Sequence, residues 1–117
     1  MLTVEWVKRQ DGHWCRLERL DLDSVDTGGV YMIWHGGDQP RVVRVGQGGD
    51  IAKQLQRLIE APEILAYKNY GELFVTWAVV PASKRDGVVC YLTENWSPLI
   101  GKPCPLIFPI TVNSPFE

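Results

Sequence analysis

Runs of apolar residues divided by turn residues predict three strands. Residues 30–34 form a β-branched and aromatic run, and residues 41–45 return after a turn rich in glycine and proline. Residues 73–80 are almost continuously apolar and lie between Gly71 and Pro81. The first two runs are close enough to form a hairpin, so the pattern predicts a three-stranded antiparallel sheet.

Helical spacing follows the glycine-rich loop at residues 46–49. Asp50 is a good N-cap for a helix over residues 51–59, because the apolar residues there recur on one face. A short second helix is expected over residues 63–70. A third is expected from Asp86, acting as its cap, to Trp96, and should end before Pro98.

The order of these elements predicts one α+β domain over residues 1–117, with helices packed on the sheet. Residues 1–13 are either a short strand or a loosely held segment. The proline-rich tail, residues 102–117, is expected to run extended across the domain. Five tryptophans indicate a core built on large aromatic side chains.

Composition narrows the class of protein only modestly. The chain of 117 residues is long enough to fold without disulfides or a structural metal. Its three cysteines contain no Cys-x-x-Cys pair, so neither a disulfide framework nor a zinc site is expected. No secretory leader pattern or membrane-length apolar run is present, and a reducing cytoplasmic location is the expectation. The net charge of −2 argues mildly against tight nucleic-acid binding.

Two short motifs carry a resemblance to a known family. Residues 29–31 read Gly-Val-Tyr at the start of the first strand, and residues 43–48 read Val-Arg-Val-Gly-Gln-Gly at the end of the second. With the hairpin spacing and the two later helices, residues 28–101 resemble the GIY-YIG nuclease domain, and specifically small bacterial GIY-YIG-like proteins. The resemblance implies a GIY-YIG-like layered fold, with a central three-stranded antiparallel sheet flanked by helices.

In active members, the resemblance implies hydrolysis of a DNA phosphodiester with Mg²⁺ or Mn²⁺. Tyr31 stands where the family has a tyrosine that positions or activates the attacking water, and Arg44 replaces the tyrosine of the second motif. The family also places a charge-stabilising arginine on the next helix and a metal-binding glutamate on the later one. The arginine and the bound metal stabilise the negative charge that develops on the phosphoryl group.

Both helix positions hold residues without that chemistry. Ten residues beyond Arg44 lies Gln54, which is neutral, and nine residues before Pro98 lies Val89, which cannot bind a cation. Arg57 lies about 60° round the helix from Gln54 and can partly substitute for it. The pattern predicts a degenerate site whose catalytic remnants are Tyr31, Arg44 and Arg57, with no metal and no cofactor unless Asp86 becomes a ligand.

The other polar residues suggest binding of a nucleic acid rather than hydrolysis of it. His35 shares a face with Tyr31 and is a possible base, although a solvent-exposed turn histidine is the expectation. The residues expected to contact phosphate are all basic, and scattered surface charge is the competing explanation. They are Arg41, Arg44, Lys53, Arg57, Lys84 and Arg85.

These observations favour a GIY-YIG-nuclease-like domain that has lost endonuclease activity and acts as a nucleic-acid- or protein-binding module, with no membrane partner. The alternative is a diverged metal-dependent DNA endonuclease that uses Arg44, Arg57 and Asp86 in relocated roles. A third interpretation sets the resemblance aside and describes a small aromatic-rich assembly or inhibitor module.

Overall fold

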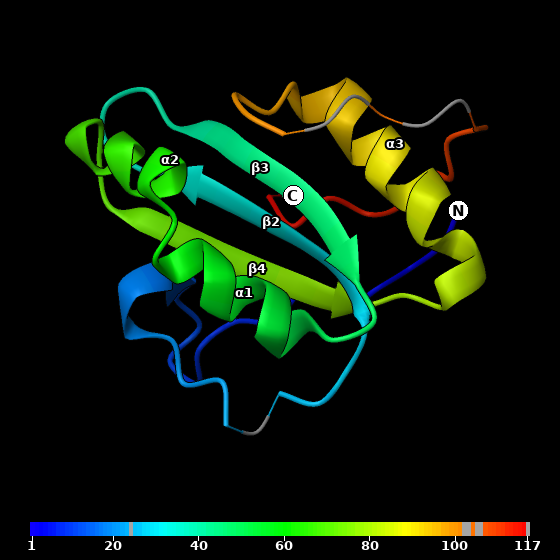
Figure 1. Cartoon of the computed structure of the whole chain (residues 1–117). Helices are drawn as coiled ribbons and strands as arrows, with labels where there is room; N and C mark the ends of the chain where they lie inside the picture. Colours follow the sequence, from blue (N-terminus) through cyan, green and yellow to red (C-terminus); the bar gives the residue numbers. More distant parts are fainter. Residues whose placement is uncertain (24, 102–103, 105–106, 117) are drawn as a thin grey trace.

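An antiparallel sheet forms the centre of the computed structural model, which describes residues 1–23, 25–101, 104 and 107–116. Its long strands are β2 (Gly29–His35), β3 (Arg41–Gly48) and β4 (Leu73–Val79), with β2 in the middle (Figure 1). The class predicted from the sequence, α+β, is confirmed, and all three predicted strands are present. The strand β2 pairs with both neighbours over its full length, from Gly29 to His35.

The expected number of strands was wrong, because the sheet has four. A two-residue strand, β1 (Cys15–Arg16), pairs with Val75 and Phe74 at the outer edge of β4, which gives the order β1-β4-β2-β3. The short helix η1 (Leu17–Arg19) follows β1 directly and buries Leu17. A strand of two residues is too short to show an alternating pattern in the sequence. It forms only because the edge of β4 offers backbone groups to pair with.

Helices cover both faces of this sheet. The first, α1 (Ile51–Ile59), begins at Asp50, whose carboxylate accepts a hydrogen bond from the Lys53 backbone N–H at 3.1 Å, as expected of an N-cap. The short second helix is present as α2 (Pro62–Leu65) continued by η2 (Ala66–Asn69). The last helix, α3 (Arg85–Trp96), follows the short helix η3 (Ala82–Lys84) and ends before Pro98.

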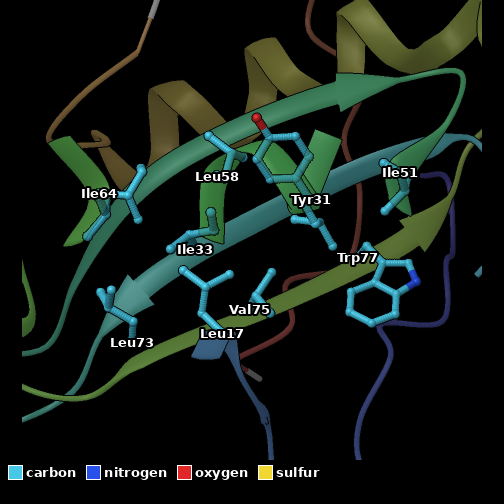
Figure 2. Packing of buried hydrophobic residues seen from close by; sticks show 11 residues of the cluster. Leu17, Tyr31, Ile33, Ile51, Leu58, Ile64, Leu73, Val75 and Trp77 are labelled. Carbon is cyan, nitrogen blue, oxygen red and sulfur yellow. The ribbon is translucent and has the colours of Figure 1, made fainter. Parts of the chain in front are cut away.

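Alternation along β2 divides the buried side chains into two cores. The α1-side core lies between the sheet and α1, and Figure 2 shows its packing. It consists of Leu17, Tyr31, Ile33, Val43, Ile51, Leu55, Leu58, Ile64, Leu73, Val75 and Trp77. The α3-side core consists of Val30, Met32, Trp34, Val42, Val80, Val88, Val89, Leu92 and Val112. Of the five tryptophans, Trp34 and Trp77 are buried, at 7% and 6% exposed, so the expected aromatic core is confirmed only in part.

The two ends of the chain lie together against the domain. Leu2 forms an isolated parallel bridge with Val112, and the Asn113 side chain both accepts from and donates to the backbone of Val4. In the tail, the Ile110 N–H donates to the Gly87 carbonyl on α3 at 2.9 Å. The described part of the tail therefore contacts its own domain. Residues 102, 103, 105, 106 and 117 lie outside the described residues.

A disulfide joins Cys90 on α3 to Cys104 in the tail. The expectation of no disulfide was therefore wrong, because an odd cysteine count still permits one pair with one cysteine left over. The leftover thiol is Cys15, and its partial burial raises its pKa above the ordinary value. The pair also removes the cysteine argument for a reducing compartment. Among the described residues, no helix is both long and apolar enough to cross a membrane.

Candidate functional site

The two motifs bring Tyr31 and Arg44 into direct contact on the α1 side of the sheet. Arg44 donates from Nε to the Tyr31 hydroxyl at 3.1 Å. The Tyr31 ring crosses Gly46 on β3, where a Cβ atom would lie only 2.3 Å from the hydroxyl oxygen. In Figure 2 that oxygen points away from the aliphatic side chains of the α1-side core. Glycine at position 46 is therefore required for the tyrosine to reach the arginine.

Tyr31 is 1% exposed, so its ring is a core residue. A water molecule activated by this tyrosine would need access to the hydroxyl, and the Arg44 guanidinium already occupies one side of it. The geometry suits a structural contact in which Arg44, partly exposed on β3, covers the polar end of a buried ring.

Gln54 lies on the β3 side of α1. Its Cγ atom would be 2.7 Å from a Cβ atom on Gly48, so the side chain packs closely over the last residue of β3. Lys53 and Arg57 are exposed on the same helix. The helix position that the resemblance assigns to arginine is thus occupied by a neutral packing contact, and the nearby cations face water.

Val89 belongs to the α3-side core and is 9% exposed. It packs among the side chains that β2 sends to the opposite face from Tyr31, such as Val30 and Met32. The glutamate position of the resemblance is therefore a buried apolar position. No cation can be held there without placing a charge in the core.

Asp86 is exposed in the first turn of α3, and its role as the helix cap was predicted wrongly. The helix begins one residue earlier, at Arg85, and Lys84 precedes it without a side-chain cap. The Asp86 carboxylate instead accepts a hydrogen bond from Gln47 Nε2 at 2.6 Å, which ties α3 to the end of β3. In the described part of the chain, the one group of three potential metal ligands lies elsewhere, at Cys90, Glu94 and Cys104. Since both sulfurs of that group form the disulfide, neither is a thiolate ligand.

The predicted basic residues occupy separate parts of the fold. Arg41 begins β3 at the hairpin turn, whereas Lys84 and Arg85 lie at the junction of η3 and α3. Arg85 donates from Nε to the Val80 carbonyl at 2.9 Å, and its guanidinium packs against Gly28. Arg85 therefore connects the end of β4 to the residues just before β2. Arg41 and Lys84 are more exposed than Arg85.

His35 was expected to be an exposed turn residue, and that expectation was wrong. It is the last residue of β2, pairs with both Arg41 and Leu73, and is 5% exposed. Its ring packs against two tyrosines, Tyr67 and Tyr70, which follow from the short helices between α1 and β4. Strand alternation was the one indication in the sequence, because it puts His35 on the same face of β2 as Tyr31.

These three rings line a hollow of about 730 Å³ at the turn end of the β2–β3 hairpin. We call it the hairpin-end hollow. Its lining residues are mostly polar or aromatic: His35, Asp38, Gln39, Arg41, Tyr67, Asn69, Tyr70 and Leu99. The volume lies in the range of ligand-binding clefts. No motif in the sequence marks this hollow, because its residues come from three separate segments, residues 35–41, residues 67–70 and Leu99.

Comparison with known proteins adds no relative. No family model, no curated protein and no solved structure matches the chain. The function is therefore argued from the geometry and from the resemblance in the two motifs.

Proposed function

We propose that this chain is a GIY-YIG-like domain that binds its ligand without hydrolysing phosphodiesters. The observation that carries the proposal is the burial of Val89. Where an active member would hold a metal ion with a carboxylate, this chain has an apolar side chain that is 9% exposed and packed in the α3-side core. Phosphoryl transfer depends on fixed positive charge at the reacting phosphate, and this position cannot supply it.

The surroundings of Tyr31 support the same conclusion. Its hydroxyl accepts a hydrogen bond from Arg44, and the ring is almost completely buried. Gln54, at the arginine position of the resemblance, is neutral and packs on Gly48. Each of the three positions therefore has a structural contact that explains its residue.

The order of strands and helices along the chain supports the resemblance to the GIY-YIG domain. The hairpin of β2 and β3 leads through a glycine loop into the capped helix α1, then through β4 to α3. Exposed cations on α1 and at the hairpin turn, such as Lys53, Arg57 and Arg41, remain available for ligand contacts.

A plasmid-nicking assay in Mg²⁺ or Mn²⁺ tests the proposal. We expect supercoiled DNA to stay intact at protein concentrations well above those used for an active nuclease. Nicking that disappears in the Tyr31→Phe variant would show instead that the tyrosine is catalytic. Nicking that survives in Tyr31→Phe but disappears in Asp86→Asn would favour the diverged nuclease with relocated residues.

A further inference from the structure

We propose that the hairpin-end hollow is a binding site for an unpaired nucleobase, supplied by a single-stranded nucleic acid or a free nucleotide. The proposal extends the function above by naming a ligand and a surface that the motifs do not mark. It is tested separately, because cleavage of DNA and binding of a base are different measurements.

The first observation concerns the hydrogen-bonding state of His35. Its Nδ1 lies 2.9 Å from the Gly36 carbonyl, which only accepts, so Nδ1 carries the proton and Nε2 is an acceptor in the neutral ring. No buried side-chain nitrogen or oxygen of the described residues lacks a partner, and Nε2 has no protein partner. Nε2 must therefore open to solvent, although the residue is only 5% exposed. His35 thus presents a fixed polar atom at the wall of the hollow.

The second observation is an aromatic platform. The rings of His35, Tyr67 and Tyr70 lie with centroids 5.5 to 6.3 Å apart, and the planes of His35 and Tyr67 differ by 4°. Tyr70 is tilted about 30° from both and is 66% exposed. An exposed aromatic ring beside two others offers a surface on which a nucleobase can stack. A base in a duplex is already stacked on both faces, so the site favours an unpaired one.

The third observation is the charge of the hollow. Arg41 and Asp38 both line it, so its formal charges cancel. A site built for the phosphate backbone would carry an excess of positive charge. A base edge instead offers donors and acceptors side by side, which suit a carboxylate, a guanidinium, tyrosine hydroxyls and His35 Nε2 together. The balance favours recognition of a base over recognition of phosphate.

A smaller cavity at the side of the hairpin is a weaker candidate. It measures about 450 Å³ and is lined by Trp34, Pro40, Arg41, Val42, Trp96 and Phe116. Phe116 packs edge-on against Trp34 and Trp96, with ring centroids 4.8 and 5.0 Å away. The chain's own C-terminal segment therefore fills part of that cavity, whereas the described residues leave the hairpin-end hollow open.

The test measures binding of a fluorescently labelled 12-nucleotide single strand, of the same strand in a duplex, and of nucleoside monophosphates. We expect the single strand or the monophosphates to bind, and the duplex to bind at least tenfold more weakly. Tyr70→Ala should weaken binding about tenfold because the stacking face is lost, and Tyr70→Phe should retain it. Phe108→Ala is the matched control, since Phe108 is 91% exposed and lies in the tail.

Nuclear magnetic resonance locates the ligand. The chain has two histidines, and His13 is exposed in the N-terminal turn, outside the hollow. Ligand should shift the imidazole signal of His35 and leave that of His13 unchanged. Binding by strand alone or by monophosphate alone identifies the source of the base. The proposal is overturned if neither binds, if duplex binds as well as single strand, or if Tyr70→Ala and Phe108→Ala behave alike.

Discussion

Arg44 Nε donates a hydrogen bond to the hydroxyl of Tyr31 at 3.1 Å, and thereby joins the two motif residues across neighbouring strands. The ring of Tyr31 is 1% exposed, and only its polar end reaches the partly exposed arginine. The motif residues are thus partners in a structural contact. In an active nuclease, the tyrosine would have to be accessible to water or substrate.

A double-mutant cycle measures this contact. Tyr31→Phe should lower the free energy of unfolding by about 1 kcal/mol, because Arg44 loses its acceptor while the ring stays packed. Arg44→Met keeps most of the apolar stem. The two changes together should cost less than the sum of the single changes, by about 1 kcal/mol, in urea unfolding. Strict additivity would mean that the hydrogen bond contributes nothing to stability.

Gly46→Ala should destabilise the protein by about 1–3 kcal/mol, the range for overpacking a core. The new Cβ would lie 2.3 Å from the Tyr31 hydroxyl, and the buried ring has little room to move. Gly49→Ala, just beyond the end of β3, is the matched control, because a Cβ there meets nothing within 4 Å. Thermal unfolding should separate the two variants, and equal melting temperatures would contradict the packing described at Gly46.

Introducing at position 89 the carboxylate that the resemblance implies should not create a metal site. Val89→Glu places a charged group in the α3-side core and should cost about 3 kcal/mol or more. Val89→Ala, which removes volume without adding charge, should cost less. Calorimetric melting with and without Mn²⁺ provides the readout. A Val89→Glu protein that is as stable as the wild type and is further stabilised by Mn²⁺ would show that position 89 faces a usable site.

The disulfide between Cys90 and Cys104 should contribute about 3 kcal/mol to stability, the value expected for a closed loop of about 15 residues. Reduction should therefore shift urea unfolding of the wild type to lower urea. The double variant Cys90→Ser, Cys104→Ser should unfold like the reduced protein and be insensitive to reductant. Cys15→Ser keeps the pair intact and serves as the control. A wild type that is insensitive to reductant would argue against the bond.

The sequence predicted the elements that carry an apolar run or an apolar face between turn residues. The strands β2, β3 and β4 are apolar runs, α1 buries one apolar face, and α3 lies between Pro81 and Pro98, so all five were expected within a few residues of their observed bounds. The two-residue β1 was missed because its pairing depends on an edge that β4 supplies. The cap of α3 was misplaced because η3 precedes the helix, and Asp86 bonds to a distant strand residue instead.

Of the candidate site, the sequence marked only residues that belong to the two short motifs or lie at fixed spacings from them. The motifs marked Tyr31 and Arg44 as residues of interest, but their contact and the packing of Gln54 beside the end of β3 are seen only in the structure. Burial of His35 depends on Tyr67 and Tyr70, which are more than thirty residues away in the chain. Long-range packing of this kind leaves no local pattern, so the hairpin-end hollow emerges only from the fold.

One electrophoresis experiment separates binding of a single strand from its hydrolysis. A 5′-labelled single strand is incubated with the protein and Mn²⁺, and the same sample is run on a native gel and on a denaturing gel. We expect a retarded band on the native gel and full-length strand on the denaturing gel. Shortened strands that appear with wild type and are absent with Tyr31→Phe would contradict this expectation.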